Sequence, residues 1–256
     1  MVWLRSPVHL AVERTPTTWT FVGVERRRDA APRFVAAALF SGDDLSLEAE
    51  IRRFRREQKL PSDATLVFWP SAGDRGVATL DDRAGMSVTL PKARVIRERV
   101  APFVRGGGRV REFLLPHEAI ARLVALSGWP AACVLAMHAC GACLAIVEGG
   151  TARGSYLTWA PAGPAKNDDD RLLVRYQLAA RLAPHLVAWA REAPTARVAV
   201  CGPFSGLRSA MMPIVEELDR EIEVLDAALV GRAGPDLADP DEISGRQLAW
   251  AAAAGG

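Results

Sequence analysis

Residues 133–159 read CVLAMHACGACLAIVEGGTARGSYLTW, and this stretch decides the fold. Two apolar, β-rich runs, 133–137 and 142–147, lie on either side of the turn-prone residues 138–141. A third run, 154–159, follows a glycine-rich turn. Short apolar runs separated by turn residues are typical of strands, so the stretch predicts three consecutive strands.

The same stretch contains nineteen residues without formal charge, 129–147, which is just long enough for a transmembrane helix. Pro130, His138 and Gly141 interrupt it. Two buried strands joined by a tight connection explain the run better, so we expect no direct membrane insertion. The first ten residues have no basic segment followed by an apolar one, and the cysteines do not form a disulfide framework; both point to a cytoplasmic protein.

The first half of the chain begins with the same kind of pattern. Strands are expected at 8–13, 19–25 and 33–40, followed by a helix at 45–60 and a strand at 65–69. A helix at 92–104, a strand at 110–114 and a helix at 116–126 complete this half.

After its three strands, the second half continues with a helix at 171–192, a strand at 197–201, a helix at 205–218, a strand at 222–225 and a final helix at about 240–254. Both halves therefore show three strands, a helix, a strand and further α/β elements. This repeat of topology predicts a duplicated α/β architecture with a cleft between two lobes.

We place the first lobe at 1–128 and the second at 129–256, with the final helix packing back on the first lobe. A length of 256 residues allows one to two domains of ordinary size. Half of the residues are hydrophobic, 24% are charged and the formal net charge is +2. This balance excludes intrinsic disorder and argues against a nucleic-acid-binding protein.

The order of elements resembles that of the actin-like ATPase superfamily, which includes actin, sugar kinases and the PilM-type proteins of type IV pilus machines. Residues 134–159 occupy the place of the family's second phosphate hairpin, and 198–218 resemble its adenosine segment. Segments 222–229, 240–253 and 107–126 resemble the elements around them. The resemblance implies an α/β, two-lobed actin-like (ribonuclease H-like) duplicated fold with reduced insertions.

The phosphate-binding segments depart from the family pattern. Its first phosphate loop has Asp, then glycine two positions later, then small hydroxyl residues, whereas this chain has Glu13-Arg14-Thr15-Pro16-Thr17. The acidic residue of the second hairpin falls at about Ala136 or Met137, and neither side chain offers oxygen to a metal. Catalysis in this superfamily depends on positioning and electrostatics around the phosphates, so these departures predict no catalytic residues.

Residues 198–218, which resemble the adenosine segment, depart less from the family pattern. Gly202 and Gly206 keep the family's glycines, while Pro203 and Phe204 replace small residues. Gly202, Ser205 and Gly206 are therefore the residues of a vestigial nucleotide site, and Ser205 also suits the N-cap of the helix that follows. No cofactor is expected, with ATP as the alternative.

The resemblance and the departures together imply a non-catalytic scaffold, a pseudo-ATPase, that docks a partner protein in a membrane-associated assembly machine such as a type IV pilus or a type II secretion-like platform. The partner implied is the cytoplasmic segment of an inner-membrane assembly protein, which would place the chain at the periphery of that membrane. An active Mg·ATP-dependent ATPase or kinase is the alternative, with Glu13 as its acidic group.

A metal or redox module is the further alternative. His138, Cys140 and Cys143 supply three soft ligands, and Cys201 can approach if its strand neighbours the first strand of the second lobe. A structural zinc site usually has two Cys-x-x-Cys pairs, and this sequence contains only the pair Cys140 and Cys143. Because cysteine is also a common core residue, we expect no metal here.

Overall fold

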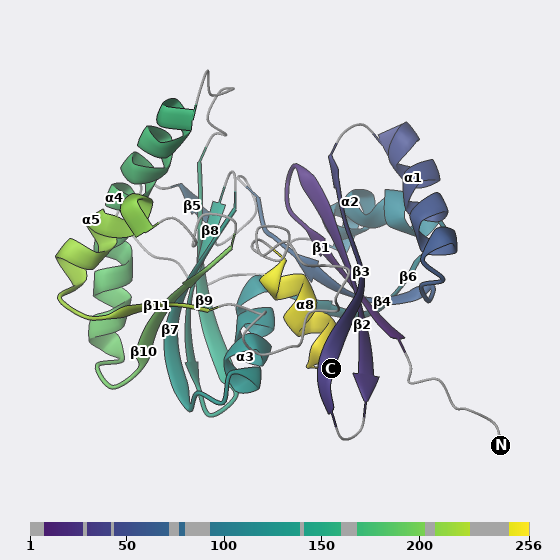
Figure 1. Cartoon of the computed structure of the whole chain (residues 1–256). Coiled ribbons are helices and arrows are strands. Elements are labelled where there is room, and N and C mark those ends of the chain that lie inside the picture. Colours follow the sequence, from purple (N-terminus) through teal and green to yellow (C-terminus); the bar gives the residue numbers. More distant parts are fainter. Residues whose placement is uncertain are drawn as a thin grey trace.

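The computed structural model describes residues 8–27, 30–41, 44–71, 77–79, 93–138, 141–159, 168–202, 208–225 and 246–255. Two mixed β-sheets stand side by side, with helices on their outer faces and between them (Figure 1). Apart from one additional short strand, Val77–Thr79, the order of the described elements follows the order expected from the sequence.

The first sheet has the strand order β3-β2-β1-β4-β6. Its strands are β1 (Val8–Arg14), β2 (Thr18–Arg27), β3 (Ala30–Ser41), β4 (Asp63–Phe68) and β6 (Arg109–Leu114). The first three strands pair antiparallel in chain order, and β4 and β6 add in parallel. The central strands are apolar because both of their faces are covered.

The second sheet repeats this order. Its strands run β11-β10-β7-β8-β9-β5, and β9-β8-β7-β10-β11 corresponds to β3-β2-β1-β4-β6 in order and direction. They are β7 (Ala131–His138), β8 (Gly141–Glu148), β9 (Thr151–Thr158), β10 (Arg197–Cys201), β11 (Ile222–Val224) and β5 (Val77–Thr79). β5, which comes from the first half of the chain, pairs in parallel with β9 and is not predicted by the sequence pattern.

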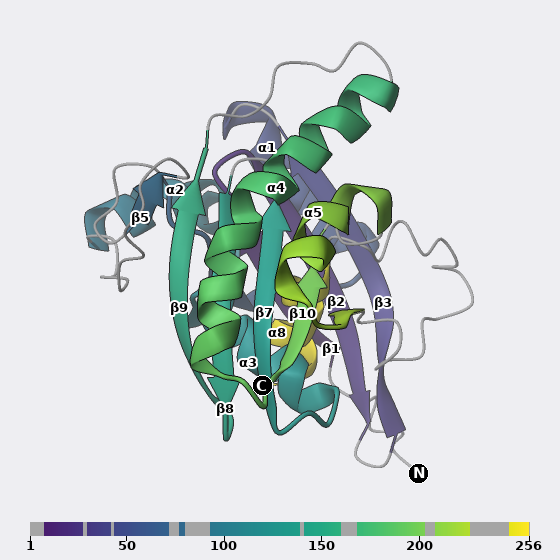
Figure 2. The same cartoon turned by 90° about the vertical axis from the view of Figure 1, so that its left-hand side faces the viewer.

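Among the described elements, four helices cover the outer faces of the sheets (Figure 1 and Figure 2). α1 (Asp44–Glu57) and α2 (Ala93–Arg105) supply Leu47, Ile51, Val100 and Phe103 to the core of the first sheet. α4 (Asp168–Glu192) and α5 (Arg208–Leu218) cover the second sheet with residues such as Leu182, Leu186 and Ile214.

Two helices lie between the sheets and form one shared hydrophobic layer with them (Figure 1). α3 (Pro116–Leu126) follows the last strand of the first sheet but packs against β7, β8 and β9 of the second. α8 (Gln247–Ala254) follows the second sheet but packs against β1, β2 and β4 of the first. Each half therefore contributes its last helix to the layer that faces the other half.

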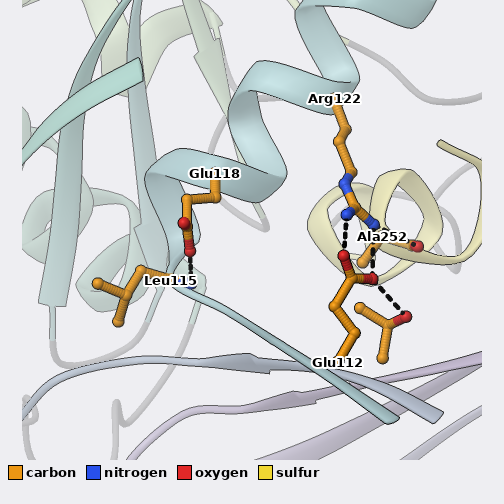
Figure 3. A network of polar contacts seen from close by, with 6 residues as sticks. Glu112, Leu115, Glu118, Arg122 and Ala252 are labelled. Carbon is orange, nitrogen blue, oxygen red and sulfur yellow. Dashed lines mark hydrogen bonds and ion pairs between the residues drawn. The ribbon is translucent and has the colours of Figure 1, made fainter. Parts of the chain in front are cut away.

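Arginines hold the C-terminal end of α8. Arg26 of β2 donates from Nε to the carbonyl of Ala253 at 2.6 Å. Arg122 of α3, which lies beside Ala252 in Figure 3, donates to the carbonyl of Ala252 at 3.2 Å. Arg122 also pairs with Glu112, whose carboxylate accepts a hydrogen bond from the Thr65 hydroxyl at 3.0 Å. Cations at the last carbonyls of a helix are favourable because they complement its dipole.

Several expectations can now be compared with the structure. The uncharged run 129–147 forms β7 and β8, and no described helix is long and apolar enough to cross a membrane. The described part of the helix expected at 205–218 begins at Arg208, and that of the final helix begins at Gln247. Residues 203–207 and 226–245 lie outside the described part of the chain.

Candidate functional site

The carboxyl ends of parallel strands from both sheets meet in the layer between them. Glu13 is the last inward-facing residue of β1, and Trp69 directly follows β4. His138 and Cys201 end β7 and β10 of the other sheet. Ligands of open α/β sheets bind at such strand ends, so this is the place to look for a functional site.

Glu13 is held by two donors. The indole Nε1 of Trp69 donates to its Oε1 at 2.6 Å, and the backbone N–H of Ala249 also donates to the carboxylate. Burial nevertheless raises the pKa of Glu13 from 4.5 to about 7, because the loss of hydration outweighs these two bonds. Its Oε2 has no hydrogen-bond partner among the described residues.

The bond to Ala249 ties Glu13 to the start of α8. The helix begins at Gln247, and its N-cap residue, Arg246, makes no side-chain capping bond. The first N–H groups of a helix need an acceptor and favour a negative charge nearby. Glu13 supplies that acceptor from β1, so it acts as a cap for a helix more than 230 residues further along the chain.

Trp69 also contacts the second sheet. Its ring meets the His138 ring edge to face, with centroids 4.3 Å apart and an angle of 73° between the planes. Its ring centroid also lies 6.5 Å from that of Tyr156. Burial lowers the pKa of His138 to about 3, so the imidazole is neutral at physiological pH.

The β1–β2 turn uses its own polar groups internally. Thr15 Oγ1 accepts hydrogen bonds from the backbone N–H of Thr18 at 2.9 Å and of Thr17 at 3.3 Å. The Arg14 guanidinium donates to the carbonyls of Thr15 and Thr18 and lies over the Trp19 ring, 4.7 Å from its centroid. The amides and the cation that a phosphate would require at this turn are thus bonded within it.

Of the predicted nucleotide residues, the structure describes Gly202 alone, and Ser205 and Gly206 lie outside the described residues. Gly202 has φ +101°, and a Cβ there would lie 2.1 Å from the carbonyl oxygen of Met137 in β7. The close approach of β7 therefore explains this glycine by packing alone.

The cysteine and histidine residues considered for a metal site are only partly brought together. Cys143 and Cys201 lie on either side of Ala136 in neighbouring strands, as expected if β10 neighbours β7. Burial raises the pKa of both thiols far above the usual range, which disfavours the thiolate that binds metals. Cys140 lies outside the described residues, and those that are described contain no group of three or more metal-ligating side chains.

Tyr156 extends the buried polar network toward α3. Its hydroxyl lies 2.7 Å from His117 Nδ1 and also bonds to the Cys143 thiol. Sequence reasoning missed Trp69, Ala249 and Tyr156 as parts of this centre. One signal points to Trp69: it ends the apolar run 65–69 that the sequence predicts as a strand, and in the structure this strand pairs in parallel with β1.

Comparisons with known proteins identify the arrangement. No protein-family model and no curated protein matches the sequence. Among solved structures, ethanolamine utilization protein EutJ from Carboxydothermus hydrogenoformans is similar with a TM-score of 0.61 and 12% identity, over 98% of this chain and 90% of that one. The PilM-PilN type IV pilus biogenesis complex gives a TM-score of 0.57 and 13% identity over 96% of both chains.

A ROK family glucokinase from Streptomyces griseus, in complex with glucose and AMPPNP, gives a TM-score of 0.56 and 12% identity over 96% of this chain and 98% of that one. The chain has the actin-like ATPase fold. This confirms the duplicated actin-like architecture predicted from the order of elements. Within the actin-like fold, the centre around Glu13 lies between the two halves.

Proposed function

We propose that this chain is a non-catalytic actin-like scaffold that docks a partner protein in a membrane-associated assembly machine, such as a type IV pilus or a type II secretion-like platform. One observation carries the proposal. The strand ends between the two sheets are filled by the chain's own side chains, and the acidic residue there, Glu13, is bonded to Trp69 and to α8.

The chemistry of the centre argues against a bound Mg·ATP. A triphosphate needs cations and backbone N–H groups, and Mg²⁺ prefers oxygen ligands that stay hydrated. Glu13 is buried and has a pKa of about 7, so it is a weak magnesium ligand. His138 is uncharged, and Arg14 is bonded to the β1–β2 turn. The described residues at the strand ends therefore offer little to phosphates.

The partner protein is inferred by analogy. One structure with the same fold is a complex of PilM with PilN from type IV pilus biogenesis. A fold without a working nucleotide site is retained most simply for binding another protein. We place this protein at the cytoplasmic face of the inner membrane, where the cytoplasmic segment of an assembly protein is accessible.

A thermal-shift experiment with Mg·ATP tests the loss of the nucleotide site. Ligand at a hundred times its dissociation constant stabilises a protein by about 2.7 kcal/mol. We expect no change in melting temperature with millimolar Mg·ATP or Mg·ADP, using an actin-like kinase as a positive control. A rise of several degrees, or Mg²⁺-dependent turnover that Glu13→Gln abolishes, would establish the ATPase alternative instead.

A binding experiment tests the partner. The cytoplasmic segment of an inner-membrane protein encoded beside this chain is synthesised as a labelled peptide, and its affinity is measured by fluorescence anisotropy with and without Mg·ATP. We expect saturable binding that is the same under both conditions. No binding of any such segment contradicts the docking role, and binding that requires Mg·ATP contradicts the nucleotide-independent scaffold.

A further inference from the structure

α2 and β6 carry far more positive charge than their counterparts in the second half of the fold. Residues 93–114 contain six basic and two acidic residues, which gives a net charge of +4. In the repeated arrangement, α5 and β11 stand where α2 and β6 stand in the first half. Residues 208–224 contain two basic and five acidic residues, a net charge of −3. The fold accepts either sign at these positions, so it does not require the positive charge of α2 and β6.

α1 lies beside α2 on the outer face of the first sheet and extends the positive charge (Figure 1). Arg105 of α2 pairs with Glu48 of α1, and Arg52 of α1 donates to the carbonyl of Arg105 at 3.1 Å. We call the exposed side of these two helices the α1/α2 surface. Its exposed basic residues are Arg52, Arg53, Arg56, Arg94, Arg97 and Arg105.

Acidic residues do not cancel this charge. Among the described side chains of α1 and α2, the exposed acidic ones are Glu57 and Glu98, against six exposed arginines. Arg94 pairs with Glu98 but is still 87% exposed, and exposed ion pairs are weak enough to leave an arginine available to another anion. Three segments outside the described part of the chain adjoin these elements in sequence, and together they contain four acidic and three basic residues: 42–43, 72–76 and 80–92.

An exposed apolar side chain lies within the α1/α2 surface. Val104 is 51% exposed and precedes Arg105 in the last turn of α2. Arg97 lies seven positions earlier in the same helix and therefore on the same side of it. Basic residues beside an exposed apolar residue are typical of proteins that bind a membrane surface, where the charges meet anionic headgroups and the apolar group meets the acyl boundary.

We propose that the α1/α2 surface binds anionic lipid headgroups at the surface of a membrane. Its arginines are distributed along two helices, so they match a plane of many negative charges better than a single acidic group. Each basic residue close to an anionic bilayer strengthens binding about fivefold, so several of them hold a protein at the membrane reversibly. The inference rests on the membrane location proposed above, but it does not depend on the docked protein partner.

Co-sedimentation with lipid vesicles tests the proposal. The full chain is mixed with vesicles of phosphatidylcholine alone, which are neutral, or of phosphatidylcholine with anionic phosphatidylglycerol. We expect binding to the anionic vesicles at low salt, its loss in about 0.5 M NaCl because salt screens exposed charges, and no binding to the neutral vesicles. The vesicles contain no protein, so this result is independent of whether the partner peptide binds.

Two double variants locate the binding surface. Arg56→Gln combined with Arg97→Gln removes one exposed charge from each helix, and we expect it to weaken binding to anionic vesicles at least about tenfold. Arg181→Gln combined with Arg191→Gln is the matched control. Both of these arginines are exposed on α4 and the change in net charge is the same, so this variant binds like the unmodified chain. Melting temperatures show that each variant is folded.

Val104→Asn separates a lipid surface from a soluble polyanion. We expect this variant to bind anionic vesicles severalfold more weakly, because it removes the apolar contact with the acyl boundary. Its binding to soluble poly-glutamate should equal that of the unmodified chain, since no charge has changed. Val104 is exposed, so the substitution leaves the core of the first sheet intact.

Three outcomes would overturn the proposal. One is a folded chain that does not bind anionic vesicles at low salt. Another is equal weakening of vesicle binding by the two double variants, which would mean that the charge of the whole chain and not the α1/α2 surface is responsible. A third is tighter binding to poly-glutamate than to vesicles with no effect of Val104→Asn on either, which would assign the surface to an acidic protein segment.

Discussion

β1 of the first sheet and β7 of the second occupy corresponding positions and end in the same layer of the molecule. Their last inward-facing side chains are of opposite acid–base type. β1 ends its inward face with Glu13, and β7 ends with His138. Burial raises the pKa of Glu13 to about 7 and lowers that of His138 to about 3. Burial opposes charge on either group, so two groups of opposite type are both driven toward their neutral forms.

The two strand ends differ in how they are held. Glu13 accepts hydrogen bonds from Trp69 and from the first turn of α8, whereas the Trp69 ring meets His138 edge to face. One indole thus touches both halves of the duplicated fold. In this chain the layer between the halves is a packed hydrophobic core to which both sheets, α3 and α8 contribute.

Removing the shared indole should have the largest effect on stability. We expect Trp69→Ala to lower the free energy of unfolding by about 3–5 kcal/mol, since it leaves a cavity and removes a donor from Glu13. Trp69→Phe keeps most of the ring and should cost about 1–2 kcal/mol. Urea denaturation measures both. Equal losses would mean that the hydrogen bond, and not the packing between the halves, dominates.

The opposite pKa shifts predict opposite dependences on pH. The pKa of Glu13 is raised from 4.5 to about 7 on folding, so the folded form binds more protons between these values and this contribution to stability falls as pH rises through that window. The pKa of His138 is lowered from 6.5 to about 3, so its contribution rises with pH from about 3 to 6.5. Between pH 4.5 and 6.5 the two largely cancel.

Single substitutions should separate these two contributions. We expect Glu13→Gln to gain stability relative to the unmodified chain as pH rises from 5 to 8, by about 2.5 kcal/mol in total. His138→Gln should remove the rise on the acid side and leave the fall between pH 4.5 and 7. Melting temperatures in matched buffers measure both. Parallel pH profiles for the two variants and the unmodified chain would contradict the assigned ionisations.

The contact between β7 and the end of β10 should have the next largest effect. Gly202→Ala puts a methyl group against the Met137 carbonyl and keeps a positive φ, so we expect a loss of about 2–3 kcal/mol. Gly128→Ala is the matched control, because Gly128 has φ +71° with nothing within 4 Å of its Cβ position. It should lose only about 1 kcal/mol, from backbone strain. If denaturant unfolding gives equal losses for the two variants, the close approach of β7 adds nothing to the cost of a side chain at position 202.

The sequence predicts the fold well because periodicity and turn residues are local signals. The apolar runs at 133–137 and 142–147 and the repeated element order suffice for the two sheets and their duplication. The centre between the sheets is less predictable. Glu13 is visible as a departure from a phosphate loop, but its bond to Ala249 joins residues more than 230 positions apart. Such contacts leave no local pattern, and β5 is likewise a strand that only the packing of the second sheet creates.

Gly202 illustrates a different limit of prediction from sequence. A glycine after a strand is compatible with a nucleotide turn and with close packing, and one sequence does not distinguish them. The Met137 carbonyl at the position of a missing Cβ favours packing. The cysteines are equally ambiguous in the sequence, which is compatible with metal ligands and with core residues. In the structure Cys143 and Cys201 are fully buried in the shared core.

The smallest expected effect concerns the C-terminal end of α8. Arg122 bonds to a backbone carbonyl there, as Glu13 bonds to a backbone N–H at the start of the helix. Arg122→Met keeps the apolar stem but removes the bonds to Glu112 and to the Ala252 carbonyl, so we expect a loss of about 1 kcal/mol. Arg94→Met removes an exposed pair with Glu98 and should change the free energy of unfolding by less than about 0.5 kcal/mol. Because Arg122 is partly buried and salt screens buried pairs less, its loss should persist in 0.5 M NaCl. A difference between the two variants that disappears in salt would mean that the bonds of Arg122 do not hold α8 more firmly than an exposed ion pair would.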